Sequence, residues 1–131
     1  MQPIPESHRD LLDRPVVVSI ATVMPNNQPQ VTPIWADLHD GHLRINTVDG
    51  RQKHTNLVER PQATFLFIDP DDPMRWMEVR GRVASRIVDD EVQVIDILAK
   101  KYLGKDVYPW HNENDTRVTF LIAPERVVTS G

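Results

Sequence analysis

The chain has 131 residues, of which 40% are apolar and 26% charged, so we expect one globular domain spanning residues 1–131. Its net charge of −4 argues against nucleic-acid binding that depends on overall charge. The absence of cysteine excludes disulfides, a thiol nucleophile and thiolate metal ligands. No apolar run approaches the roughly 20 residues that span a membrane, and residues 1–13 lack the apolar core of a signal peptide. We therefore expect a soluble, cytoplasmic protein that binds neither membrane nor nucleic acid.

The first third of the chain predicts a short helix and then three strands joined by short turns. Leu11 and Leu12 are the apolar anchors of the helix, and Arg14-Pro15 ends it. Asp40-Gly41 is a strong hairpin signal. The predicted elements are, in chain order, a helix over 6–13 and strands over 16–23, 30–38 and 42–48. This spacing predicts an antiparallel meander.

The remainder predicts further strands and two helices. An alternating pattern places Met77 and Val79 on one face of a strand and Trp76 and Glu78 on the other. Gly104 suits a helix C-terminus. The predicted elements are a helix from about 50 to 59 or 60, strands over 63–68 and 76–84, a helix from Asp89-Asp90 to about 103 with Val92 on its apolar stripe, a loop over 105–115, and strands over 116–123 and 125–129. Six to seven strands with two or three helices predict an α+β fold, mostly β, built as a small barrel.

Residues 47–57 form the most informative segment. Asp49 and Gln52 have the spacing of a capping box, which predicts a helix start. The first helical turn nevertheless carries Arg51 and Lys53, where the helix dipole favours acids. Free backbone N–H groups and two cations would together bind a phosphate. Solvated surface cations are the alternative, because the dipole penalty is only about 0.3–1 kcal/mol.

Other patterns assign no metal site and no catalytic residue. His39 and His42 flank the Asp-Gly turn without a third ligand. The acidic segment 69–72 lacks the spacing and glycine of a calcium loop, and the serines lack a nucleophile elbow. We therefore expect no metal, and the catalytic residues stay unknown.

The order of these elements, followed by Gly-Arg-x-Lys-x-x-Asn-Leu at 50–57, resembles the split β-barrel, pyridoxamine 5′-phosphate oxidase-like superfamily of flavin- and deazaflavin-binding proteins. The likeness covers residues 11–128. It is carried by Val18-Ser19-Ile20-Ala21-Thr22, Gln28-Pro29-Gln30-Val31-Thr32-Pro33-Ile34-Trp35, Asp40-Gly41, Glu59-Arg60-Pro61-Gln62-Ala63 and Val79-Arg80-Gly81-Arg82-Val83. The short chain and the Pro-Gln-Val-Thr-Pro-Ile-Trp strand are most similar to the coenzyme F420-dependent reductases. True pyridoxamine phosphate oxidases have a C-terminal Trp-and-Arg segment that this sequence does not show.

The resemblance implies an oxidoreductase in which reduced F420 gives a hydride to an electron-poor substrate, such as an activated enone or a polycyclic carbonyl compound. Arg51 and Lys53 would bind the cofactor phosphate, with Thr47 and the backbone of Gly50 close by. The cofactor ring would lie along Val31, Thr32, Pro33, Ile34 and Trp35. FMN is the alternative cofactor, because it also combines a tricyclic ring with a phosphate. A non-catalytic cofactor carrier and a plain ligand-binding barrel are the alternative functions.

The resemblance further implies a homodimer with the ring between subunits. Trp76 occupies the position from which family members approach the cofactor of the partner subunit. We expect the apolar strands around Phe65, Phe67 and Val79 to offer surface for a dimer contact in addition to a core. Trp110 would line the substrate pocket. Cations for the anionic F420 tail are expected from Lys53, His54, Arg60 and Arg14.

Two of these residues also have explanations that need no cofactor. Pro33 cannot donate to a strand ladder, so it indicates either a strand turned toward a ligand or an edge strand that borders solvent. Trp35 follows the ring-binding segment, but packing in the core or at the dimer contact would explain it equally well.

Overall fold

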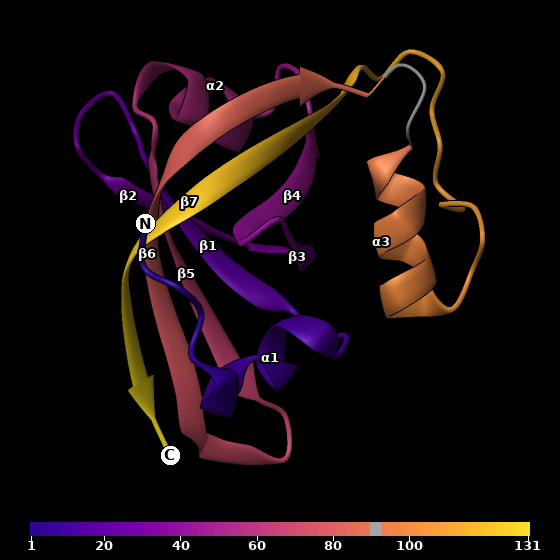
Figure 1. Cartoon of the computed structure of the whole chain (residues 1–131). Helices are drawn as coiled ribbons and strands as arrows, with labels where there is room; N and C mark the ends of the chain where they lie inside the picture. The colour runs from indigo at the N-terminus through magenta and orange to yellow at the C-terminus, as the bar shows by residue number, and fades with distance from the viewer. Residues whose placement is uncertain (90–92) are drawn as a thin grey trace.

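The computed structural model describes residues 1–89 and 93–131, and in this part of the chain seven strands form one sheet with helices outside it (Figure 1). In chain order the elements are the 3-10 helix η1 (Glu6–His8), α1 (Asp10–Asp13), β1 (Val18–Val23), β2 (Pro29–Ile34), β3 (Ala36–His39), β4 (His42–Val48), α2 (Gln52–Glu59), β5 (Gln62–Asp69), β6 (Asp72–Val88), α3 (Val94–Leu103) and β7 (Arg117–Ser130). The strand order is β2-β1-β5-β6-β7-β4-β3, and every neighbouring pair is antiparallel. The predicted split barrel, α+β and mostly β, is confirmed.

The sheet curls so far that its two edge strands are consecutive in the chain. β2 forms one edge beside β1, and β3 forms the other beside β4. Only Trp35 separates Ile34 at the end of β2 from Ala36 at the start of β3. The prediction of one continuous strand over 30–38 is therefore wrong. Pro33 lies on an edge strand, where a missing N–H donor is tolerated, and the chain crosses the opening of the barrel at Trp35.

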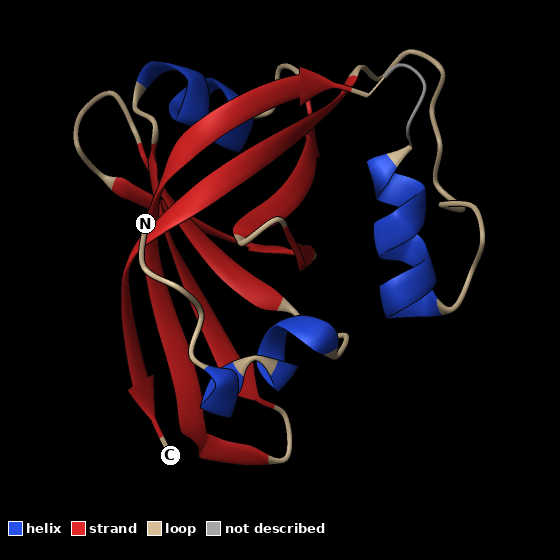
Figure 2. Cartoon of the chain, viewed as in Figure 1, coloured by secondary structure: helices blue, strands red, loops and turns tan. Residues whose placement is uncertain are grey.

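Alternating side chains fill the barrel. On β5, Phe65 and Phe67 are fully buried, whereas Leu66 and Ile68 face outward. Figure 2 shows that α2 covers the upper end of the barrel and α1 the lower end, while α3 stands to one side. The large side chains with almost no exposed surface are Phe65, Phe67, Phe120, Leu11, Leu12, Ile20, Leu43, Ile45, Leu57, Met77, Leu98 and Ile122. Burial of each contributes about 1.5–3 kcal/mol, which holds the curled sheet and its end helices together.

The two longest strands exceed their predictions. The predicted strand over 76–84 is the middle of β6, which pairs with β5 on one side and β7 on the other. The two strands predicted over 116–123 and 125–129 are one continuous strand, β7. Pro124 does not interrupt β7, because it lies opposite Gly81 where the register of the two strands shifts.

The helices partly follow their predictions. The single helix expected over 6–13 is split into η1 and α1. The helix predicted from Asp89-Asp90 begins at Val94, and Asp90 and Val92 lie outside the described residues. Gly104 ends α3 in the left-handed conformation, as predicted. None of the described helices is both long and apolar enough to span a bilayer.

Candidate functional site

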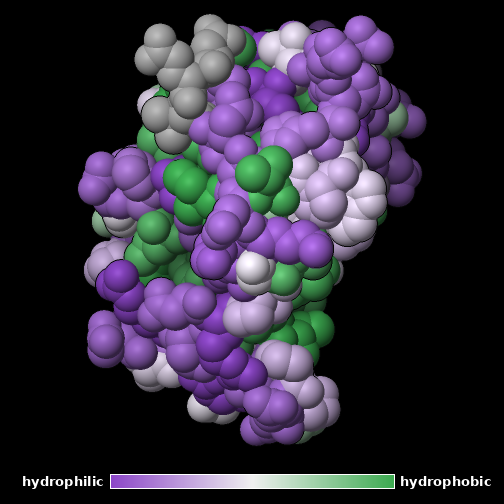
Figure 3. All heavy atoms as spheres, turned by 90° about the vertical axis from the view of Figure 1, so that its right-hand side faces the viewer, coloured by the Kyte–Doolittle hydropathy of each residue, from purple (hydrophilic) through white to green (hydrophobic). Residues whose placement is uncertain are grey.

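A cavity of about 230 Å³ lies between the opening of the barrel and α3. It is lined by Val17, Pro33, Ile34, Trp35, Asn46, Arg51, Lys53, Ile95, Leu98, Tyr108, Trp110 and Arg117. Three of these described residues are cations and none is a carboxylate, although the chain as a whole is acidic. Figure 3 views the molecule from the α3 side and shows apolar groups interspersed among hydrophilic ones on this face. The cavity therefore combines positive charge with an apolar wall.

The start of α2 supplies part of this charge. Arg51 precedes the first helical residue, Gln52, and no side chain caps the helix. The predicted capping box is wrong, because the Asp49 carboxylate lies 3.5 Å from His54 Nδ1 and 3.6 Å from Arg86 Nη2 instead. Uncapped N–H groups at a helix start can donate hydrogen bonds to an anion.

Arg51, Lys53 and Arg117 form no ion pair with any described residue. Burial lowers the pKa of Lys53, and the neighbouring charge of Arg51 lowers this pKa further. An anion beside both side chains would oppose both effects. The arrangement therefore suits a negatively charged group.

Arg117 is a site residue that the sequence did not predict. Its guanidinium donates to Asn46 Oδ1 at 3.3 Å and lies 4.8 Å from the centre of the Tyr108 ring. The Asn46 amide in turn donates to Asp89 and to Thr119 Oγ1. Arg117 is the β7 partner of Val48, the last residue of β4, so strand pairing brings it to the α2 start. Only this pairing, which is a long-range contact, could have revealed it.

Asp89 holds this network from outside the cavity lining. It accepts hydrogen bonds from Thr119 Oγ1 at 2.7 and 2.9 Å. Burial raises the pKa of its carboxyl, and the hydrogen bonds from Thr119 and Asn46 oppose that effect. The Asn46 amide is thereby oriented with its oxygen toward Arg117.

Aromatic rings form another part of the cavity wall. Trp35 stacks on Tyr102 with ring centres 5.1 Å apart and an interplanar angle of 11°. The Tyr108 ring meets Trp35 edge-on at 6.1 Å and Trp110 at 5.5 Å. Trp110 is 63% exposed and lies at the rim of the cavity, in the loop expected to line a substrate pocket. This wall offers flat apolar surface to a planar group.

Two side chains attach α3 to the barrel. Tyr102 Oη donates to Val16 O at 2.6 Å and accepts from the Ala36 N–H at 3.2 Å. Lys101 Nζ donates to Leu12 O and to Ala36 O. Burial lowers the pKa of Lys101. These contacts fix α3 on the barrel and, with it, the Tyr102 ring that stacks on Trp35.

The structure brings five of the predicted cofactor residues together in the cavity lining, namely Pro33, Ile34, Trp35, Arg51 and Lys53. Gly50 is adjacent to them in a turn with a φ of +98°. Thr47 is buried on the other side of β4 from Asn46, and its Oγ1 has no hydrogen-bond partner among the described residues. Thr32 is half-buried on β2 and does not line the cavity.

Val31 and Trp76 lie in a different place. Both line a shallow concavity of about 600 Å³ on the outer face of the sheet. Its remaining lining residues are Ser19, Ala21, Thr64, Leu66, Ile68 and Glu78. The side chains of Phe65, Phe67 and Val79 are fully buried inside the barrel and belong to its core, so they do not themselves form a contact surface. The outward-facing residues of the same strands, such as Leu66 and Ile68, form the exposed apolar surface instead.

Most of the cations expected near an anionic cofactor tail have partners within the protein. Arg14 pairs with Asp10, Asp69 and Asp71 beside α1. Arg60 donates to Val23 O at 2.6 Å and pairs with Glu59. His54 belongs to α2, and its side chain is buried. Of the expected set, Lys53 alone lines the cavity.

The chain matches known proteins over nearly its whole length. The family model described as Pyridoxamine 5′-phosphate oxidase matches residues 4–131. A solved structure named F420 Reductase has 30% sequence identity and a TM-score of 0.86, with coverage of 95% of this chain and 98% of that chain. No curated protein matches the chain.

Two more distant structures share the fold alone. The conserved hypothetical protein Rv2991 from Mycobacterium tuberculosis has 20% identity and a TM-score of 0.69, covering 97% of this chain and 84% of that chain. The heme storage protein HutZ from Vibrio cholerae has 13% identity and a TM-score of 0.69, covering 99% and 96%. The sheet topology and the family match over residues 4–131 agree, and the chain belongs to the pyridoxamine 5′-phosphate oxidase family.

Proposed function

We propose that the protein is an F420H2-dependent oxidoreductase that transfers a hydride from reduced deazaflavin to an electron-poor organic substrate, such as an activated enone or a polycyclic carbonyl compound. The observation that carries the proposal is the cavity in which Arg51, Lys53 and Arg117 face an aromatic wall without a carboxylate among the described lining residues. The similarity to a solved F420 reductase supports the same assignment.

The residues fit a cofactor with a phosphate and a flat ring. Arg51, Lys53 and the uncapped N–H groups of α2 would hold the phosphate, since charge-assisted hydrogen bonds are the strong ones. Trp35 belongs to neither β2 nor β3, so its backbone is outside both ladders and free to face the ring. When bound, reduced deazaflavin would supply the hydride. The protein would orient the ring between Pro33 and the α3 side and exclude water there.

A second copy of the chain would complete the site. Val17 and Pro33 line the cavity, whereas Ser19 and Val31 line the outer concavity, and the odd-numbered positions share one face of β1 and β2. The two hollows therefore share the outer face of β1 and β2 as part of their lining. A cavity of about 230 Å³ is smaller than the roughly 300–1,000 Å³ of small-molecule sites. A homodimer joined through the outer concavity would enlarge the cavity and bring Trp76 of the second copy to its edge.

FMN remains the alternative cofactor, because the same cations and ring surface suit it. The decisive measurement is a titration of the protein with F420 and with FMN, followed by cofactor fluorescence. Loss of one charge-assisted contact costs about 1.5–3 kcal/mol, so we expect Arg51→Ala and Lys53→Ala each to weaken binding about 10- to 150-fold. Arg82→Ala is the matched control, since Arg82 is exposed on β6 away from the cavity. The proposal fails if neither cofactor binds at micromolar concentration.

Turnover separates an enzyme from a non-catalytic carrier. Reduced F420 is mixed with the protein and a panel of enones and polycyclic carbonyl compounds, and the absorbance of the cofactor is followed. We expect oxidation of F420H2 that depends on both protein and substrate. Tight binding without turnover of any substrate would identify a carrier.

The dimer is tested separately by sedimentation velocity. Leu66→Glu places a charge in the outer concavity and is expected to yield monomers with weakened cofactor binding. Val58→Glu is the control, because Val58 is 52% exposed on α2 and lies outside this surface. A wild-type protein that is monomeric with cofactor bound would refute the dimer.

A further inference from the structure

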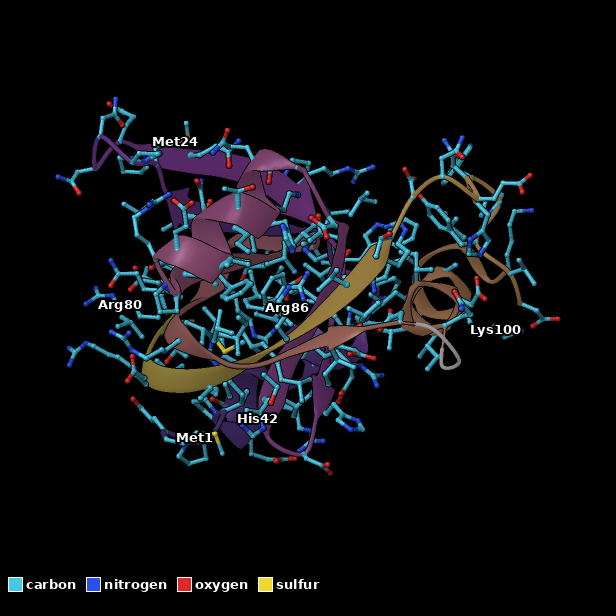
Figure 4. The ribbon with its side chains drawn as sticks, turned by 90° about the horizontal axis from the view of Figure 1, so that it is seen from above. Met1, Met24, His42, Arg80, Arg86 and Lys100 are labelled. Atoms are coloured by element: carbon cyan, nitrogen blue, oxygen red, sulfur yellow. The ribbon has the colours of Figure 1, made fainter. Side chains whose placement is uncertain are left out.

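Asp49, His54 and Arg86 form a compact cluster at the start of α2. Asp49 precedes the helix, His54 lies in its first turn, and Arg86 comes from β6. The Arg86 guanidinium donates to His54 Nε2, with Nε at 3.2 Å and Nη2 at 3.0 Å. Asp49 completes the triangle, with its carboxylate 3.5 Å from His54 Nδ1 and 3.6 Å from Arg86 Nη2. In Figure 4, which views the molecule from above, Arg86 of β6 is labelled between α2 and β7. His54 is only 6% exposed, whereas the Arg86 and Asp49 side chains are 36% and 50% exposed. His54 Nδ1 is buried and forms no hydrogen bond with the described residues, so its contact with Asp49 is electrostatic.

The cluster defines the protonation state of His54. A guanidinium has donors and no acceptor, so His54 Nε2 must accept and the neutral ring must carry its proton on Nδ1, facing Asp49. A second proton on Nε2 would point at the Arg86 cation. Burial lowers the pKa of His54, Asp49 opposes this, and Arg86 adds to it. The ring of Phe120 on β7 also packs on His54, at 5.8 Å, and carries no charge.

The same cluster borders the anion-binding turn. Asp49 immediately precedes Gly50 and Arg51, and His54 follows Lys53 on α2. The backbone N–H of Asp49 donates to Thr116 O at 2.9 Å, and the next residue is Arg117. Each of the three cavity cations is therefore close in sequence to a residue held by these contacts. Arg51 lies two residues after Asp49, Lys53 lies next to His54, and Arg117 lies next to Thr116.

We propose that Asp49, neutral His54 and Arg86 are positioning residues that hold the 49–53 turn ready for an anion, and that protonation of His54 releases Arg86 and weakens anion binding. The inference rests on the anion site of the proposed function. It predicts a pH dependence of unusual sign. At a simple cationic site, acidification adds positive charge and strengthens anion binding, whereas here acidification disrupts the arrangement of the cations.

Sulfate is the probe of choice, because it stays doubly negative over the range that titrates histidine. Its dissociation constant is measured by NMR titration of the full chain between about pH 8 and pH 5. For the wild type we expect affinity to fall about tenfold toward acid pH, equivalent to the loss of one ordered contact. His54→Gln keeps an acceptor toward Arg86 and is expected to abolish the pH dependence while retaining the affinity seen at pH 8. Arg86→Gln should bind weakly at every pH, and Arg82→Gln, on the same strand, should match the wild type.

The outcomes separate the inference from the function on which it rests. Wild-type affinity that is constant or rises toward acid pH overturns the inference, as does equal weakening by Arg82→Gln. A second test needs no ligand. Long-range ¹H–¹⁵N correlation spectra are expected to show that neutral His54 carries its proton on Nδ1. A proton on Nε2 would overturn the inference and leave the proposed anion site unaffected. A chain that binds neither sulfate nor cofactor overturns both proposals.

Discussion

Replacing Tyr102 with phenylalanine removes one oxygen atom that joins α3 to the barrel. That hydroxyl donates to Val16 O and accepts from the N–H of Ala36, a residue with no exposed surface. The stacking on Trp35 needs only the ring and is retained. In Tyr102→Phe the buried Ala36 N–H is left without its acceptor, which costs about 1–3 kcal/mol.

The expected loss is measured as the free energy of unfolding in urea, with the transition followed by tryptophan fluorescence. Tyr108→Phe is the control for stability, because among the described residues the Tyr108 hydroxyl forms no hydrogen bond, although its ring also contacts Trp35. Destabilisation below about 0.5 kcal/mol, or equal destabilisation by Tyr108→Phe, would refute the reasoning.

The same substitution should affect binding of the cofactor ring but not binding of the anion. α3 and the following loop contribute the aromatic side of the cavity, whereas the cations Arg51 and Lys53 come from the α2 side. We therefore expect Tyr102→Phe to weaken binding of F420 or FMN and to leave the affinity for sulfate unchanged. Equal weakening of sulfate and cofactor would show that the variant disturbs the whole site and not the position of α3.

Three further predictions concern stability. Gly81→Ala should destabilise the fold by about 1–3 kcal/mol in urea, because the new Cβ would come within 2.8 Å of Ala123 O. The backbone N–H of Asp71 and then the guanidinium of Arg75 hold the pKa of Asp69 below its usual 3.8. The ionised Asp69 therefore stabilises the fold above that pH, and its contribution is lost on further acidification. Arg75→Gln should remove part of this contribution, so that acid unfolding, followed by circular dichroism, occurs at higher pH. Burial raises the pKa of Asp89, so ionisation of its carboxyl opposes folding. The thermal midpoint of the wild type should therefore decline as the pH rises through that pKa. Asp89→Asn should remove this decline.

Local patterns in the sequence predicted the elements whose determinants are local. The predicted strand over 42–48 matches β4, and the left-handed Gly104 ends α3 as expected. The alternation on β6 correctly separated buried Met77 and Val79 from outward-facing Trp76. Period and cap chemistry operate over a few residues, which is why they can be read from one sequence.

Features that depend on distant pairing were not predictable. The break at Trp35 exists because β2 and β3 join opposite edges of a curled sheet, and nothing near Trp35 encodes the partners β1 and β4. Arg117 reaches the cavity only because β7 pairs with β4. The inward direction of Phe65 and Phe67 was not predictable for a different reason: alternation shows that a strand has two faces but does not say which face is inside.

The failed capping box explains how cations can stand at the positive end of α2. A capping Asp49 would occupy the N–H groups of the first turn and place a carboxylate among Arg51 and Lys53. The structure instead directs that carboxylate to His54 and Arg86, which leaves the N–H groups uncapped. The repulsion between helix dipole and cations, about 0.3–1 kcal/mol, is then not offset by a capping carboxylate, and an anion at the proposed site would relieve it. The cations that break the local rule at this turn are therefore what the proposed anion site requires.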